Sequence, residues 1–111
     1  MTALSARSDG NIVATTVHAL DALGNPVRRT ILTTLRTSPL AVGELATRFP
    51  VSRPAISRHL RVLEDAGLVE HRAHGARSVY AVRVQGLASV RDFLDEFWDT
   101  ALSRLEELAK E

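Results

Sequence analysis

Residues 51–69, VSRPAISRHLRVLEDAGLV, carry the signals that begin and end a helix. The hydroxyl of Ser52 suits an N-cap, because it accepts a hydrogen bond from a backbone N–H of the first turn. Pro54 fits that first turn, where its missing N–H leaves no hydrogen bond unmade. Gly67 is typical of the residue that follows a helix. The segment therefore predicts a helix that begins after Ser52 and ends before Gly67.

The predicted helix has one apolar face and one polar, basic face. With about 100° between successive residues, Ile56, Leu60 and Leu63 fall within one narrow arc. The opposite side carries Pro54, Ser57, Arg58 and Arg61. We expect the apolar face to lie in the core, so that the basic face is left free for a contact outside the domain.

Two helices are predicted before this one. Residues 11–24, NIVATTVHALDALG, place apolar side chains at helical spacing, with Asn11 as N-cap and Gly24 as the stop. The stretch NPVRRTILTTLRTS follows at once and begins a second helix, with Asn25 as cap and Pro26 in the first turn. Its predicted buried residues are Val27, Ile31, Leu32 and Leu35.

A short helix and a hairpin are predicted on either side of the segment that follows Ser52. Residues 39–49, PLAVGELATRF, predict a short helix with Leu45, Ala46 and Phe49 on one face. Residues 68–82, LVEHRAHGARSVYAV, alternate and are rich in β-branched residues, which predicts a β-hairpin of about five residues per strand with HGAR as its turn.

The last predicted element is a long helix from Gly86 onward, with apolar residues at spacings of three and four. The element order is that of a winged helix-turn-helix, a mainly α fold with a small β-hairpin, with extra helices at the N- and C-termini. The length of 111 residues allows one domain. We expect residues 1–10 to be a flexible tail and residues 11–111 to form one functional domain.

Charge is distributed unevenly along the chain. Residues 26–83 have a balance of +6, residues 84–111 one of −4 and residues 1–25 one of −1. A basic centre between neutral or acidic ends is typical of a protein whose middle faces a nucleic acid.

The composition excludes several classes of function. The chain has no cysteine, which excludes disulfides, thiolate metal sites and cysteine nucleophiles. No apolar run approaches the roughly 20 residues that span a bilayer, and the N-terminus lacks a signal-peptide pattern. We therefore expect a cytoplasmic protein with no membrane contact.

The stretches LGNPVRRTILTTL, PLAVGELATRFPVSRPAISRHLRVLEDAGLVEHRAHGARSVYAV and FLDEFWDTALSRLEEL carry a resemblance to a known family. They are similar to the ArsR/SmtB family of bacterial transcriptional repressors, and most similar to its branch without metal sites, which includes the SdpR-like autorepressors. The match covers residues 20–108 and is specific in SRPAISRHLRVLEDAGLV, which agrees in residue type and in its place before the wing.

The resemblance implies that residues 53–66 form a recognition helix in the DNA major groove and that the turn around Gly75 forms the wing. The residues it places near double-stranded operator DNA, together with those on the outer faces of the predicted helix and hairpin, are Ser52, Arg53, Pro54, Ser57, Arg58, His59, Arg61, Arg72, His74 and Arg77. For His59, packing against the preceding helix and a DNA contact remain equal alternatives.

The family members are homodimers joined by their terminal helices. Carried to this chain, the predicted interface residues are Val13, Val17, Leu20, Leu94, Phe97, Trp98, Ala101 and Leu105. The residues also support this, since Phe93, Trp98 and Leu102 widen the last helix's apolar stripe beyond what packing on one neighbour needs.

We predict neither a bound metal nor a cofactor. Where metal-sensing members have a cysteine pair, this chain has Ala41, Val42 and Gly43, and no histidine lies beyond His74. We also predict no enzyme activity, because Ser57 and His59 are two residues apart on a helix and face different directions.

The function predicted is that of a homodimeric, sequence-specific regulator of transcription, a repressor acting on a palindromic operator. One alternative is a regulator controlled by an effector or an unconventional metal site between the terminal helices. Another is a winged helix that binds a protein instead of DNA. Arginines on the recognition face and wing favour DNA.

Overall fold

A computed structural model describes residues 17–110 of the chain. Residues 17–23 are helical, and seven elements follow: α2 (Pro26–Leu35), β1 (Leu40–Ala41), α3 (Val42–Ala46), α4 (Arg53–Asp65), β2 (Val69–His74), β3 (Arg77–Val82) and α5 (Val84–Lys110). This is the predicted order of a helix-turn-helix followed by a hairpin and a long terminal helix. The predictions that fall on residues 1–16, including the tail, the Asn11 cap and Val13, lie outside the described residues.

The core is built by the apolar faces that the sequence predicts. Ile56, Leu60 and Leu63 of α4 are fully buried, and they pack with Ile31 and Leu35 of α2. The predicted caps are also present: the Asn25 side chain accepts hydrogen bonds from two backbone N–H groups at the start of α2. Val27, which was predicted to be buried, is half-buried at the edge of this core.

The short helix differs from its prediction. The first part of the stretch 39–49 is extended, because Leu40 and Ala41 pair with Tyr80 and Val79 of β3 and are buried there. The helix α3 begins only at Val42 and ends at Ala46. Phe49 therefore lies after the helix, half-buried against the core.

The hairpin joins β1 in a three-stranded antiparallel sheet of order β1-β3-β2. Each hairpin strand has six residues, one more than predicted, because pairing continues out to His74 and Arg77. Gly75 and Ala76 alone connect the two strands, and Gly75 has a φ of 63°. A positive φ at the first position of a two-residue turn is the geometry in which glycine is preferred.

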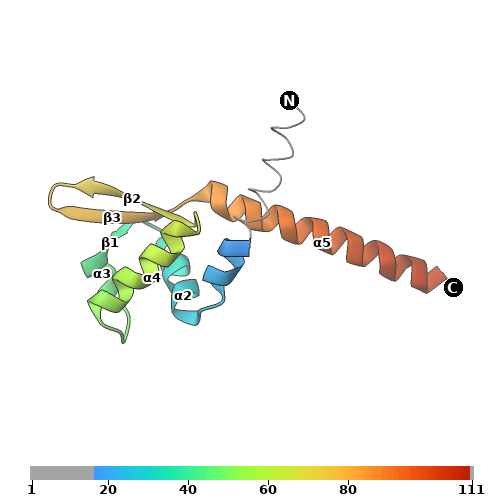
Figure 1. Ribbon diagram of the computed structural model, residues 1–111, viewed down its shortest axis with the longest axis horizontal. Coiled ribbons are helices and arrows are strands. Elements are labelled where there is room, and N and C mark those ends of the chain that lie inside the picture. The colour runs from blue at the N-terminus through green and yellow to red at the C-terminus, as the bar shows by residue number, and fades with distance from the viewer. Residues whose placement is uncertain (1–16, 111) are drawn as a thin grey trace, which may run out of the picture.

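A close approach between Gly86 and Gly67 sets the position at which α5 leaves the body. A β-carbon on Gly86 would stand 1.9 Å from the carbonyl oxygen of Gly67, so only glycine allows the start of α5 to approach the end of α4 this closely. From there α5 runs away from the body on the side opposite to the hairpin (Figure 1). Among the described residues, no helix combines the length and the apolar character needed to cross a membrane.

Candidate nucleic-acid interface

The outer face of α4 is exposed and basic, as predicted. The Ser52 hydroxyl accepts a hydrogen bond from the N–H of Ala55 at 3.3 Å, and Pro54 lies in the first turn. Because Ile56, Leu60 and Leu63 take up the buried arc, the side chains on the opposite arc point to solvent. The exposed predicted residues on α4 are Arg53, Pro54, Ser57, Arg58 and Arg61.

The hairpin forms a second exposed basic surface. Arg72 and His74 on β2 and Arg77 on β3 are all exposed. Arg77 is not free of partners, because its Nη2 donates to Oε1 of Glu44 on α3. This exposed ion pair links the turn of the hairpin to α3.

The start of α4 and the hairpin turn meet in one place. A cavity of about 220 Å³ lies between them, lined by Val42, Arg53, Ser57, Ala76, Arg77 and Ser78. The Nη1 atom of Arg53 also lies 3.6 Å from the point where a β-carbon on Gly43 would stand. The structure thus brings together three of the predicted DNA-contact residues, Arg53, Ser57 and Arg77, from two elements.

His59 is half-buried and packs against α2. Nη1 of Arg28 donates to Nδ1 of His59 at 3.4 Å, so the neutral imidazole acts as the acceptor. Burial lowers the pKa of His59, and the positive charges of Arg28 and Arg58 lower it further. His59 thus packs against α2 and not, as one alternative from the sequence had it, against the preceding helix, and its DNA contact stays a prediction.

A second histidine ties the hairpin to the other end of α4. His71 Nδ1 lies 2.5 Å from Oε2 of Glu64, and the His71 ring lies against Tyr80 with 5.2 Å between ring centres. Burial raises the pKa of Tyr80, and the Glu64 carboxylate raises it further, against an opposing effect of Arg61. His71 thus links β2 to α4, and its ring also contacts Tyr80 of β3.

Sequence reasoning missed Glu44 and Arg28. Glu44 occupies the third position of α3, where its Oε1 accepts from the N–H of Ala41 at 3.0 Å, and that spacing could have been read as half of a capping box. The pairing with Arg77, 33 residues away, has no local signal. Arg28 Nε donates to the carbonyl of Ala22 at 2.6 Å, which joins α2 to the end of the helix before it.

The terminal helix carries a large uncovered apolar face. Val90 is buried against the body, but Phe97, Trp98 and Leu105 are 64%, 63% and 61% exposed. The predicted interface residues Leu94 and Val17 are also exposed, whereas Leu20 and Ala101 are half-buried. The predicted set thus lies on two separate elements, the described end of the first helix and the projecting part of α5.

Comparison with known proteins identifies the family. A family model described as a helix-turn-helix domain matches residues 23–72. The HTH-type transcriptional regulator Rv2034 of Mycobacterium tuberculosis is 50% identical over 91 residues, covering 82% of this chain and 85% of the relative. The transcriptional repressor SdpR of Bacillus subtilis is 33% identical over 65 residues, covering 59% of this chain and 72% of SdpR.

A solved structure extends the likeness to the whole arrangement. It is the homodimeric winged helix-turn-helix DNA-binding domain of Mb0332 from Mycobacterium bovis, a possible ArsR-family transcriptional regulator. The TM-score is 0.68 at 26% identity, with 86% of this chain and 89% of that one covered. The chain belongs to the ArsR/SmtB family of transcriptional regulators. The winged helix-turn-helix fold and the DNA-binding regulatory function predicted from its sequence are thereby confirmed.

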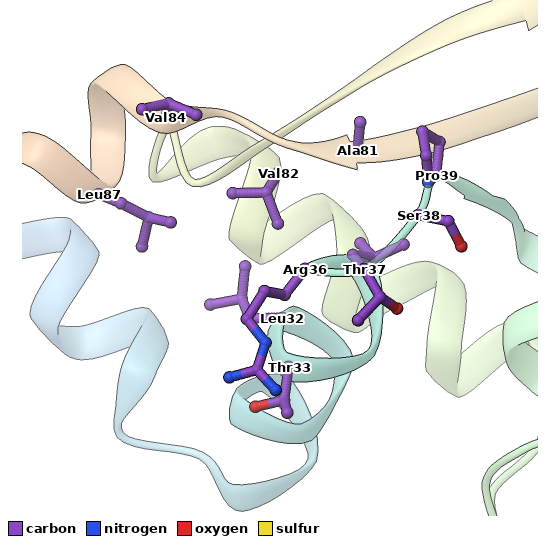
Figure 2. A pocket seen from close by; sticks show the side chains of 11 residues that line it. Leu32, Thr33, Arg36, Thr37, Ser38, Pro39, Ala81, Val82, Val84 and Leu87 are labelled. Carbon is purple, nitrogen blue, oxygen red and sulfur yellow. The ribbon is translucent and has the colours of Figure 1, made fainter.

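This ArsR/SmtB-family chain also has a hollow on a different side, which Figure 2 shows from close by. Its volume is about 560 Å³, and it lies between the end of α2, the loop to β1, strand β3 and the start of α5. Leu32, Val82 and Leu87 give it apolar walls, and the Arg36 side chain lies along it in Figure 2. None of the predicted site residues lines this hollow.

Metal-ligating side chains do not gather within residues 17–110. No group of three or more histidine, cysteine, aspartate or glutamate residues in this part of the chain is placed to hold a metal ion. The four histidines are spread over three elements: His18 lies on the first helix, His59 on α4, and both His71 and His74 on β2.

Proposed function

We propose that this chain is a homodimeric repressor that binds a palindromic double-stranded DNA operator and carries out no chemical reaction. The observation that carries the proposal is the exposed basic face of α4, set beside the arginine-bearing wing. We place the protein in the cytoplasm, the compartment that holds bacterial DNA. No metal or cofactor is part of the proposal.

The shape of this surface supports DNA as the ligand. A single helix fits the major groove of B-DNA, which is about 12 Å wide, and arginine is the side chain most often used to read guanine O6 and N7. Arg58 and Arg61 lie on the exposed face of α4, beyond its first turn. We assign the base contacts to these two and to Ser57, and the backbone contacts to Ser52, Arg53, Pro54 and the wing residues Arg72, His74 and Arg77.

The apolar face of α5 supports a dimer. The radius of gyration is 17.6 Å, whereas a compact domain of this size has about 13 Å. The difference arises because α5 projects from the body (Figure 1). Phe97 and Trp98 lie near the middle of α5 and are exposed. Exposed aromatic side chains on such a helix are typical of an interface. The structural relative Mb0332, whose domain is homodimeric, supports a second copy of this chain as the partner.

Repression requires only that the dimer bind at the promoter. A dimer that occupies a promoter excludes the polymerase and needs only affinity and a defined site. The relative SdpR is named a transcriptional repressor, which supports repression over activation.

Selection from a pool of random DNA fragments, followed by footprinting, tests the proposal. Because a two-fold axis relates the recognition helices, the selected fragments should contain an imperfect palindrome with half-site centres about 10 bp apart or a multiple of that. A single unrepeated half-site would contradict the dimer. Failure to enrich any sequence would contradict specific DNA binding and favour a protein-binding winged helix.

The hollow beside Arg36 favours a second candidate function, a regulator released from DNA by an effector. Apolar walls with one guanidinium suit an apolar molecule that carries an acidic group, and the volume lies in the range of ligand pockets. Decanoate should then protect the protein from thermal unfolding, and Arg36→Gln should abolish the protection while Arg48→Gln preserves it. Equal protection by decanol, or none by decanoate, would remove this candidate.

A further inference from the structure

We propose that Arg53 and Arg77 form a subsite for one backbone phosphate of the operator, and that Glu44 weakens this subsite by occupying Arg77. The inference rests on the proposed DNA-binding function and assigns a role to a residue that does not touch DNA bases.

The two guanidinium groups come from different elements and converge on α3. Arg53 is the first residue of α4, and Arg77 is the first residue of β3 after the wing turn. Arg77 Nη2 donates to Glu44, and Arg53 Nη1 lies close to the backbone of Gly43, the residue before Glu44. The start of the proposed recognition helix and the wing therefore share one basic site.

The cavity between the two arginines has the chemistry of an anion site. Its lining contains two guanidinium groups and the hydroxyls of Ser57 and Ser78, and no lining residue carries a carboxylate. Planar guanidinium groups donate paired hydrogen bonds to phosphate oxygens, and hydroxyls are common phosphate donors. Phosphate contacts fix the register of a protein on the duplex, and this site lies directly beside the base-reading face of α4.

Glu44 stands at the edge of this site as the one acidic partner that the structure gives Arg77. The carboxylate does not swing away freely, because its Oε1 also accepts the hydrogen bond from Ala41 N–H at 3.0 Å. Both partners of the ion pair are about half exposed, so the pair contributes little to stability and opens readily. When Arg77 rotates to contact a DNA phosphate, the carboxylate of Glu44 remains nearby and repels the phosphate.

The geometry gives Glu44 a role in limiting affinity. A phosphate must compete with the carboxylate for Arg77 and then tolerate its negative charge. Because every DNA sequence carries backbone phosphates, the charge of Glu44 lowers the affinity for operator and for random DNA alike. The regulator thereby depends more on its base contacts, which differ between sites.

Glu44→Gln tests the inference, because the amide keeps an acceptor for Ala41 N–H and removes only the charge. We expect affinity for operator and for random DNA to rise by about 1.5-fold to fivefold, the size of one surface charge interaction. The slope of log K against log salt should steepen by up to about 0.9, the value of one neutralised phosphate. Glu107→Gln is the matched control, because Glu107 is an exposed glutamate near the end of α5, an element that contributes no residue to this cavity.

A double variant separates a local effect from a general one. With Arg77→Gln in place, the additional change Glu44→Gln should give no gain in affinity. Arg53→Gln alone should make the salt slope shallower by about 0.9, which tests the subsite independently of any change at Glu44.

The outcomes are distinct. An unchanged or weaker affinity of a folded Glu44→Gln variant overturns the inference, and so does an equal gain from Glu107→Gln or an unchanged slope for Arg53→Gln. Wild-type protein that selects no operator would instead overturn the proposed function, whatever the variants do.

Discussion

The Nη1 atom of Arg28 lies 3.4 Å from Nδ1 of His59, which joins α2 to the helix proposed to read DNA. The same guanidinium donates through Nε to the carbonyl of Ala22 and through Nη2 to that of Asp21. One arginine therefore connects three helices. Its bond to the imidazole requires that His59 be neutral, because a protonated ring has no acceptor and would bring two positive charges together.

This contact predicts that stability falls as the pH is lowered below about 6.5, the ordinary pKa of histidine. Burial, Arg28 and Arg58 hold the pKa of His59 below that value in the folded state. Between the two pKa values the unfolded chain binds more protons at this site, so the free energy of unfolding decreases as the pH falls through this window. In the His59→Gln variant, which retains an acceptor, the free energy of unfolding should change less between pH 7.5 and 5.5. Urea titrations at each pH measure it.

The comparison for this experiment is His74→Gln. His74 lies exposed beside the wing turn and makes no contact with Arg28, so this variant controls for the loss of a histidine as such. An identical dependence in wild type and His59→Gln would show that the Arg28 contact does not control the titration.

Arg58→Ala should weaken binding to the operator by about 1–3 kcal/mol, the contribution of an arginine that reads a guanine edge. Arg58 is exposed on α4, so the loss should come from the complex and not from unfolding. Fluorescence anisotropy with operator and with random DNA measures the effect. An equal loss on both would show that Arg58 contacts only phosphate. Arg36→Ala, at an exposed arginine beyond the end of α2, is the control and should have little effect.

Leu60→Ala should destabilise the protein by about 2–5 kcal/mol, because it leaves a cavity beneath α4. Leu60 is fully buried, whereas Val62 on the same helix is 41% exposed. Val62→Ala should therefore cost much less. Urea unfolding at equal protein concentrations compares the two variants, and equal losses would contradict the assignment of the buried face.

The helices α2 and α4 were predictable because their signals are local, whereas the bounds of α3 were not. Ser52, Pro54 and Gly67 set the limits of α4 from within a single stretch of chain, and the spacing of Ile56 and Leu60 set its buried face. Strand β1 was not predictable. Its two residues are extended because a strand 40 positions later pairs with them, as Leu40 does with Tyr80.

The candidate site likewise has one part that the sequence predicts and another that it does not. The exposed arginines of α4 follow from periodicity once the apolar face is assigned. The pairing of Arg77 with Glu44 and of Arg28 with His59 depends on how α2, α3, α4 and the hairpin pack together. Periodicity describes one element at a time, so it leaves such contacts between elements undetermined.

Trp98→Ala should impair dimerisation while leaving the fold of the body intact. Trp98 lies on the projecting part of α5 with 63% of its surface exposed, so it contributes little to the core of its own chain. Large aromatic residues dominate the energy of many interfaces. Analytical ultracentrifugation should show a shift toward monomer, and DNA affinity should fall with it. Val84→Ala, at an exposed apolar residue where α5 begins, is the control. A Trp98→Ala variant that stays dimeric at micromolar concentration would contradict the proposed interface.

Zinc should not release this protein from its operator. Zinc sites use thiolate, imidazole or carboxylate ligands that converge on one point, and this chain has no cysteine and four histidines. Two of the histidines are already engaged, His59 with Arg28 and His71 with Glu64.

A site shared between two copies is equally disfavoured. His59, His71 and His74 lie on α4 and β2, the elements proposed to face DNA, whereas His18 lies on the first helix, proposed to face the partner. The carboxylates of α5, such as Asp95 and Glu96, are exposed and would bind hard ions weakly and without selectivity. Regulation would then depend on another ligand or on the protein's own concentration. A gel-shift titration decides this, since release at low-micromolar zinc that a chelator reverses would contradict metal-independent binding.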